Sequence, residues 1–183
     1  IPHYSFLSSS NQKKFYSHSF LYLINPQRYN SKKAYLEALQ KAPYPLMILD
    51  LSFQDSFLTS KDLARIRKGR KGRNPILLCY FSIGEAETYR YYWKKKWFHH
   101  PPSWLEKENP KWEGNFKVRY WHPQWQQILF QYLKKIIRAG FDGVYLDIVD
   151  AFEYFEAKYK QKKQKSDLIP SPKGPSSQKK KKI

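Results

Sequence analysis

The sequence contains few residues of several kinds, and each shortage excludes a class of site. Its single cysteine, Cys79, stands inside an apolar run and indicates a buried structural thiol, since one cysteine permits neither an internal disulfide nor a cysteine-rich zinc site. Only seven glycines occur, and Gly69, Gly72 and Gly84 are isolated, so the sequence has no phosphate-binding loop. No apolar run reaches the length of about 18 residues that a membrane span needs.

Acidic residues are scarce as well, because 15 aspartates and glutamates face 34 lysines and arginines and leave a formal net charge of +19. Residues 158–183 contain ten of those lysines and a single acidic residue, so nearly half of the excess lies in one short segment. A basic surface of this kind indicates ordinary solvated charge first, an anionic glycan or cell surface second, and nucleic acid least. A basic nucleic-acid or surface-binding module is therefore only an alternative.

What the sequence does contain is a repeated alternation of apolar runs and helical segments. Four short runs are apolar throughout, which is typical of parallel strands that are covered on both faces. They are Phe20–Ile24, Leu46–Leu49, Ile76–Phe81 and Val144–Leu146. With 41% hydrophobic and 18% aromatic residues in a length of 183, the chain has enough apolar material for one folded domain.

Signals for helix beginnings and ends lie between these runs. Ser31 is expected to begin the first helix, and Thr59 with Asp62 forms a capping-box pair at the second. A third helix is predicted from Pro123, a favoured first-turn residue, to a C-terminal end at Gly140. Strands that alternate with helices in this order predict right-handed β-α-β units, and therefore an α/β fold with a parallel sheet.

The connection between the third run and the third helix, roughly residues 84–122, is unusually long. All six tryptophans fall in it or just after it, and they are Trp93, Trp97, Trp104, Trp112, Trp121 and Trp125. We interpret the connection as a structureless loop, which in a compact domain is usually functional. Trp125 lies on the apolar face of the third helix and is expected in the core. For the others, packing against the sheet is the first interpretation and stacking on sugar rings the second; we assign Trp121 to the substrate site.

Carboxylates follow the ends of the predicted strands, and they are Asp50, Glu85, Glu87, Asp147 and Asp150. Ligands of parallel α/β folds bind beyond the C-terminal ends of the strands, so we expect these side chains to converge. Glu87 and Asp150 also stand where the next helices are expected to begin and could serve as helix caps instead. Two carboxylates are the minimum for glycoside hydrolysis, and a cluster of them also suits Mg²⁺ or Ca²⁺. We assign no metal ion and no cofactor to the site.

Several segments resemble glycoside hydrolase family 114, a TIM-barrel family that includes endo-α-1,4-polygalactosaminidases and the TM1410-like bacterial and archaeal proteins. The resemblance covers roughly residues 18–160 and is most specific in two motifs, Ser-Ile-Gly-Glu-Ala-Glu at 82–87 and Asp-Gly-Val-Tyr-Leu-Asp-Ile-Val-Asp at 142–150. It implies the N-terminal half of a (β/α)8 TIM barrel, with parallel strands one to four and intervening helices. It also implies an endo-acting glycosidase of amino-sugar polysaccharides, although the basic chain suits a cationic polymer poorly.

The resemblance further implies roles for individual residues. Asp147 would be the catalytic nucleophile, and Asp50, Glu85 and Arg90 would line the substrate site with Tyr80 or Tyr145 close by. To these we add Asp150 and Trp121 from the patterns described above. The partner carboxylate of the family is expected after a later strand, but beyond Tyr159 this sequence passes into a segment rich in Lys, Gln, Ser and Pro.

We therefore divide the sequence into an N-terminal extension (1–17), a partial glycoside hydrolase-like domain (18–160) and a lysine-rich, low-complexity tail (161–183). We expect a product that is truncated after the fourth strand and incomplete or inactive as an enzyme, since a full barrel needs about 250 residues. A non-catalytic carbohydrate-binding protein is the main alternative. The expected partner is a polysaccharide or oligosaccharide, and the exposed sheet edges of half a barrel favour self-association. The resemblance implies an extracellular or cell-envelope location, although no signal peptide is visible.

Overall fold

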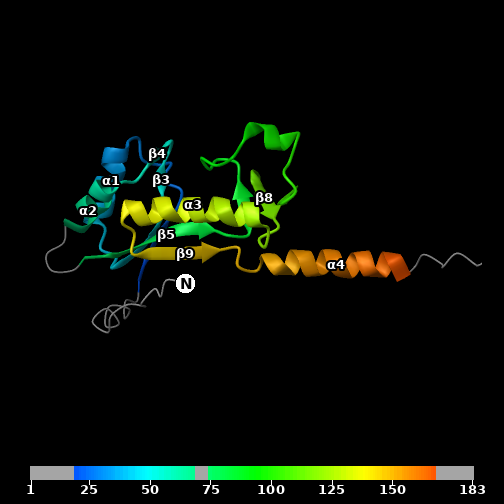
Figure 1. The fold of residues 1–183 in the computed structure, drawn as a ribbon. Coiled ribbons are helices and arrows are strands. Elements are labelled where there is room, and N and C mark those ends of the chain that lie inside the picture. Colours follow the sequence, from blue (N-terminus) through cyan, green and yellow to red (C-terminus); the bar gives the residue numbers. More distant parts are fainter. Residues whose placement is uncertain (1–18, 69–73, 168–183) are drawn as a thin grey trace, which may run out of the picture. The chain divides into compact units, whose positions relative to one another are not determined.

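The computed structural model describes residues 19–68 and 74–167, which belong to two units that meet between Val149 and Asp150 in the sequence (Figure 1). The predicted N-terminal extension lies outside the described residues. Among the helices that are described, none has both the length and the apolar character needed to cross a membrane.

The first unit is built on a four-stranded parallel sheet, as predicted. Its strands, in the order in which they lie side by side, are β1 (Leu21–Leu23), β2 (Leu46–Leu49), β5 (Ile76–Ser82) and β9 (Gly143–Asp147). Each of them coincides with a predicted apolar run. Strand order in the sheet follows order in the chain, which is the arrangement of one half of a (β/α)8 barrel.

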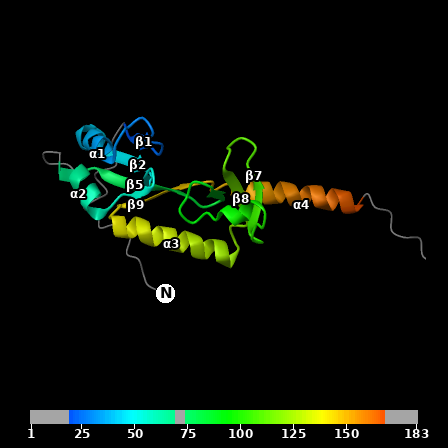
Figure 2. The ribbon, with the colours of Figure 1, turned by 90° about the horizontal axis from the view of Figure 1, so that it is seen from above.

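Three helices connect these strands, and they are α1 (Lys32–Lys41), α2 (Ser60–Lys68) and α3 (Pro123–Ala139). The predicted signals mark their ends: the Ser31 hydroxyl accepts a hydrogen bond from the backbone N–H of Ala34, and Gly140 follows α3 with a left-handed φ of 87°. A short hairpin of β3 (Ser52–Phe53) and β4 (Ser56–Phe57) precedes α2. Figure 2 shows the three helices placed alongside the sheet.

The strands divide their side chains between two faces. One face packs with all three helices in a single core, whose members include Tyr35, Met47, Leu49, Leu63, Leu77, Cys79, Phe81 and Ile136. Alternation along the strands turns Tyr22, Tyr80 and Tyr145 toward the other face. The Tyr22 and Tyr145 rings meet there at a centroid distance of 5.7 Å, although a flat sheet would separate their outer strands by about 14 Å. Curvature of the sheet and the length of both side chains close that gap, so this face is concave.

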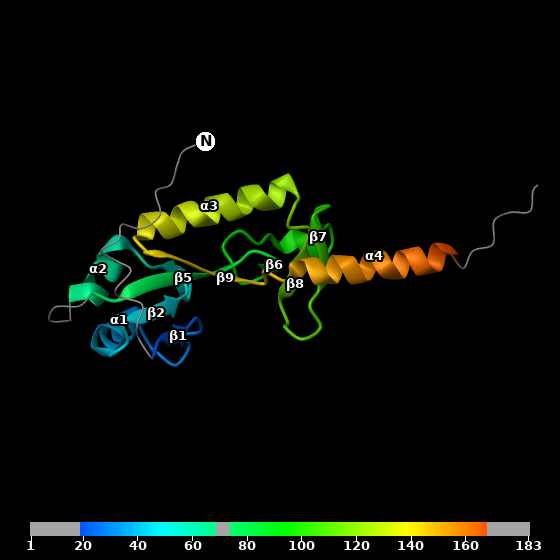
Figure 3. The same cartoon turned by 90° about the horizontal axis from the view of Figure 1, so that it is seen from below.

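The connection from β5 to α3 is not the structureless loop that we predicted. It contains a 3₁₀ helix, η2 (Lys95–Phe98), and an antiparallel sheet in the order β6 (Glu85–Glu87), β8 (Asn115–Val118) and β7 (Leu105–Glu108) (Figure 3). A second core of Ala86, Trp97, Trp104, Val118 and Trp125 fills this region. Strand pairing between segments that are far apart in the sequence is invisible to local periodicity, which explains the wrong prediction.

The second unit is described by one helix, α4 (Ala151–Asp167). Asp150 directly precedes it, as expected for a residue at a helix beginning. The helix continues through the first residues of the predicted tail, since Lys and Gln favour helices almost as strongly as Ala. Residues 168–183 of that tail lie outside the described residues.

Candidate functional site

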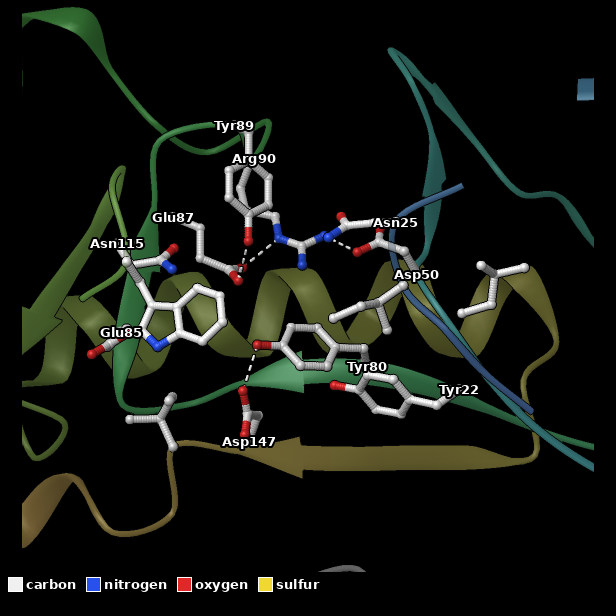
Figure 4. Close-up of a pocket in the computed structure, with 14 residues that line it drawn as sticks. Tyr22, Asn25, Asp50, Tyr80, Glu85, Glu87, Tyr89, Arg90, Asn115 and Asp147 are labelled. Atoms are coloured by element: carbon white, nitrogen blue, oxygen red, sulfur yellow. Dashed lines mark hydrogen bonds and ion pairs between the residues drawn. The ribbon is translucent and has the colours of Figure 1, made fainter. Parts of the chain in front are cut away.

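A pocket of about 590 Å³ lies beside the C-terminal ends of the parallel strands. The strand ends contribute Tyr22, Leu23, Ile24, Asn25, Asp50, Tyr80, Asp147 and Ile148, and the long connection contributes Glu85, Glu87, Tyr89, Arg90, Trp112 and Asn115 (Figure 4). The predicted convergence of Asp50, Glu85 and Asp147 is therefore confirmed, and Arg90 and Tyr80 join them.

Arg90 forms ion pairs with two of the pocket's carboxylates. Its Nη1 donates to Asp50 Oδ2 at 2.6 Å, and its Nε donates to Glu87 Oε2 (Figure 4). Its Nη1 also donates to the Tyr132 hydroxyl at 2.9 Å. Burial lowers the pKa of the guanidinium, but Glu87 and Asp50 outweigh burial and raise it above its ordinary value. Arg90, Asp50 and Glu87 are all buried, so their ion pairs stabilise the structure of the site.

Glu87 receives further support inside the same network. The Tyr89 hydroxyl donates to Glu87 Oε1 at 2.5 Å, and the Tyr92 hydroxyl accepts from the Glu87 backbone N–H at 3.2 Å. Burial raises the pKa of Glu87, while Arg90 and Tyr89 oppose that shift by stabilising the carboxylate. Both Glu87 oxygens are thus engaged by the protein, and Glu87 lies in β6 rather than at a helix beginning as we had expected.

Glu85 is paired by Lys117 of the neighbouring strand β8 and by Asn109, which follows β7. Its Oε1 accepts from Lys117 Nζ at 2.8 Å and from Asn109 Nδ2 at 2.8 Å. Lys117 stands directly across from Glu85 in the β6–β8 register, so strand pairing sets this contact. Glu85 is only 2% exposed, and a carboxylate at that depth requires such a partner.

Asp147 differs from the other three carboxylates. Its Oδ2 accepts a 2.6 Å hydrogen bond from the Tyr80 hydroxyl, and no lysine or arginine in the described residues forms an ion pair with it (Figure 4). Burial, the nearby Glu87 and the hydrogen bond to Asp147 all raise the pKa of Tyr80, so its phenol stays protonated and remains a donor. Asp147 is therefore held in place by a neutral donor and, unlike the other three carboxylates, not by a cationic side chain of the described residues.

Three predicted substrate residues are not among those that line the pocket. Tyr145 is not part of the lining, although its ring contacts Tyr22, which is. Trp121 is 50% exposed and contacts Tyr120. Asp150 belongs to the second unit. The structure thus separates Trp121 and Tyr145 from the residues that form the pocket surface.

Other lining residues were not assigned to the site from the sequence. Tyr22, Tyr89, Trp112 and Asn115 all face the pocket. Trp112 carried a weak signal as one of six tryptophans in the long connection, and Tyr89 adjoins Arg90. Asn115 carried no signal, because only the antiparallel pairing of β6 with β8 brings it opposite Glu87.

Binding of Mg²⁺ or Ca²⁺ was the main alternative to glycoside hydrolysis as a role for the carboxylate cluster. Among the described residues, no group of three or more His, Cys, Asp or Glu side chains is arranged to hold a metal ion. Asp50 and Glu87 instead share Arg90, and Glu85 pairs with Lys117.

Comparison with known families agrees with the geometry. The model of glycoside-hydrolase family GH114 matches residues 23–169, which is most of the chain. The chain belongs to family GH114. The match includes all residues of the pocket except Tyr22.

This chain is also similar in sequence to uncharacterised proteins of other organisms. A protein of Methanocaldococcus jannaschii, MJ1477, is 42% identical over 130 residues, which are 69% of this chain and 36% of that protein. A Thermotoga maritima protein is 49% identical over 80 residues, or 44% of this chain and 25% of that protein. The matches thus span between a quarter and about a third of the length of these relatives.

A solved structure supports the fold of this GH114 chain. The glycoside hydrolase domain of PelA from Pseudomonas aeruginosa superposes with a TM-score of 0.52 at 15% sequence identity. The match covers 79% of this chain and 50% of that one. The described parallel sheet and its helices therefore resemble part of a TIM-barrel glycoside hydrolase domain, as the sequence predicted.

Proposed function

We propose that this chain is a glycoside hydrolase-like domain that binds an amino-sugar polysaccharide in the pocket and presents Asp147 as the attacking carboxylate. The observation that carries the proposal is the state of Asp147, which is oriented by Tyr80 and has no cationic partner in the described residues. A nucleophile must keep its charge available for the anomeric carbon, whereas a carboxylate held in an ion pair is already neutralised.

The local charge of the pocket supports an amino sugar. Its lining contains four carboxylates and one arginine, although the chain as a whole carries +19. Lys117 neutralises Glu85 from outside the lining, and the remaining charge is still negative. An ammonium group on a sugar ring is attracted to such a pocket, while the basic exterior repels a cationic polymer elsewhere. A substrate of this kind favours an extracellular or cell-envelope location, which we include in the proposal.

The same carboxylates limit the reaction. Hydrolysis of an ordinary glycoside uses two carboxyl groups, one of which protonates the leaving oxygen. In the described residues Asp147 is the unpaired one, and the other three in the pocket are bound to Arg90 or Lys117. We therefore infer that these residues suffice to bind the sugar and attack it, but turn over a natural polysaccharide poorly or not at all without a second acid.

An activated substrate tests whether Asp147 attacks the sugar when no second acid is available. In 2,4-dinitrophenyl α-galactosaminide the leaving phenolate needs no proton, so an acid is not required. Asp147 would form a bond to the anomeric carbon as the bond to the phenolate oxygen breaks, and the phenolate would leave with the electron pair. We expect a burst of about one dinitrophenolate per chain, and a mass increase of one galactosaminyl group that peptide mapping places on Asp147.

The variant Asp147→Asn should reduce the burst to background and prevent the adduct, while thermal unfolding stays close to that of the wild type. Asp55→Asn serves as the matched control, because Asp55 is exposed and lies outside the pocket. If the wild type binds galactosamine oligosaccharides without any burst, and Asp147→Asn binds them equally well, the chain is a non-catalytic carbohydrate-binding protein and the proposed nucleophile is wrong.

A further inference from the structure

The turn that joins β7 to β8 brings two unexplained side chains to the pocket. Trp112 and Asn115 both line it, and neither is used by the network around Arg90 or by the bond between Tyr80 and Asp147. In Figure 4 the Asn115 amide points into the space that Glu87 also faces. They come from the inserted antiparallel sheet, whereas Asp147 comes from the parallel sheet.

The turn is held in shape without the Trp112 side chain. The backbone N–H of Trp112 donates to Asn109 O, and that of Asn115 donates to Trp112 O, each at 3.1 Å. Gly114 donates from its N–H to Glu108 Oε1 at 2.6 Å and accepts from Thr88 N–H at 2.8 Å.

The conformation of this turn requires glycine at position 114. Gly114 has a positive φ of 79°, and a Cβ atom there would lie 2.6 Å from Thr88 Oγ1. A backbone arrangement with a left-handed residue and a close approach to a neighbouring segment requires glycine. The turn is therefore preorganised, and the position of Trp112 and Asn115 beside the pocket does not depend on a ligand.

Trp112 gains little from packing inside the protein. Its side chain is 64% exposed, in contrast to Trp97 and Trp104, which are buried in the second core. No ring contact to Trp112 is found in the part of the chain that the structure describes. A large indole on a rigid turn at the mouth of a pocket offers a flat apolar surface of the kind that suits a pyranose ring.

Asn115 has an unmet requirement for a hydrogen bond. Its Oδ1 is buried and has no partner in the described residues. A buried polar atom without a partner destabilises the fold by about 1–3 kcal/mol, so a donor group of a ligand that bonds to such an atom in a pocket gains affinity. An amide oxygen accepts, and the matching donor is a sugar hydroxyl or ammonium group.

We propose that Trp112 and Asn115 form a second sugar-binding position, which we name the turn subsite. Trp112 stacks on one ring of the bound glycan, and Asn115 accepts a hydrogen bond from a hydroxyl or ammonium group of that ring. The turn subsite deepens the proposed function and rests on it for the identity of the sugar. In this arrangement one sugar ring meets Asp147 and a second ring meets the turn, so the ligand is an oligosaccharide.

The test compares an oligosaccharide with a single-ring substrate. Binding of galactosamine oligosaccharides to the full chain is measured by calorimetry for Trp112→Ala and Asn115→Ala. We expect affinity to fall by about 10-fold for Trp112→Ala and about 3–10-fold for Asn115→Ala. The burst with the single-ring dinitrophenyl substrate is measured in parallel as a separate readout of Asp147, and it should remain within about twofold of wild type in the control variants Trp121→Ala and Asn74→Ala.

Matched controls are Trp121→Ala, an exposed tryptophan outside the lining, and Asn74→Ala, an exposed asparagine before β5. Oligosaccharide affinity that is unchanged in both turn variants, or lost equally in Trp121→Ala, overturns the turn subsite. The two proposals fail differently: a wild-type burst with no effect of the turn variants removes only the subsite. Turn-dependent oligosaccharide binding without any burst keeps the subsite and removes Asp147 as nucleophile.

Discussion

At the scale of single residues, Arg90 determines the electrostatic state of the site. It is 6% exposed and holds Asp50 and Glu87, which are buried as well. Its guanidinium also lies over the rings of Tyr80, Tyr89 and Tyr132, at 5.0 to 5.7 Å from their centroids. Together with the pair of Lys117 and Glu85, these contacts leave Asp147 as the pocket carboxylate without a cationic partner among the described residues.

Replacing Arg90 should therefore destabilise the fold strongly. In Arg90→Gln two buried carboxylates lose their cation, and removal of one partner from a buried ion pair typically lowers stability by about 3–5 kcal/mol. Urea unfolding monitored by tryptophan fluorescence measures the change. Arg65→Gln is the matched control, because its pair with Glu37 is about 40% exposed on both sides and should change stability by less than about 1 kcal/mol. Equal losses in the two variants would contradict this account of Arg90.

At the scale of secondary-structure elements, the beginning of α2 illustrates how local chemistry sets a boundary. The backbone N–H of Thr59 donates to Asp62 Oδ2 at 2.8 Å, and the backbone N–H of Asp62 donates to Thr59 Oγ1 at 3.3 Å. Lys32 of α1 adds an ion pair to Asp62 at 2.8 Å. Burial alone would raise the pKa of Asp62, but the bonds from Lys32 and Thr59 outweigh it and lower the pKa.

This lowered pKa predicts how stability changes with pH. The ionised Asp62 contributes stability above its unfolded pKa of about 4, and the contribution is lost as the pH falls through the lower folded pKa. Asp62→Asn should destabilise the protein by about 1 kcal/mol at pH 7, the usual value of a helix cap. In thermal unfolding the difference from wild type should shrink as the pH falls from 4 to about 3. A difference that is equally large at both ends would show that the charge of Asp62 is unimportant.

At the scale of the whole molecule, the outer strands of the parallel sheet leave apolar side chains uncovered. Among the described residues β1 and β9 are those outer strands, and Leu146 in β9 is 47% exposed. Parallel strands are normally buried on both faces, and an open edge is a template for pairing with another chain. The open edges of β1 and β9 among the described residues, together with the uncovered Leu146, favour pairing with another chain.

We propose that a second copy of this chain pairs along these edges. Sedimentation velocity at high ionic strength, where repulsion between chains of charge +19 is screened, should show a dimer. Leu146→Lys should give monomers, since a charge on an edge strand opposes pairing.

The control for that experiment is Phe98→Lys, which places the same charge on an exposed apolar residue of η2, away from both edge strands. It should dimerise like the wild type. A wild type that stays monomeric throughout the micromolar range, or a dimer that Phe98→Lys disrupts as strongly as Leu146→Lys, would contradict pairing through the sheet edges.

The sequence alone determined the elements whose signals are local. Continuous apolar runs placed β1, β2, β5 and β9, because parallel strands are covered on both faces and need no polar alternation. Ser31, Thr59, Pro123 and Gly140 marked helix ends, because capping groups satisfy backbone donors and acceptors within a few residues. The strand-end rule likewise brought Asp50, Glu85 and Asp147 to one pocket, since parallel strands all end at the same edge.

Only the tertiary structure decided which of those carboxylates is available and which aromatic residue faces the pocket. Arg90 reaches Asp50 across 40 positions and Lys117 reaches Glu85 across 32, so the pairing that leaves Asp147 unpaired depends on distant segments. The inserted antiparallel sheet buries Trp97 and Trp104, presents Trp112 and places Trp121 outside the lining. Charge compensation and exposure are properties of neighbours in space, and the order of residues does not reveal those neighbours.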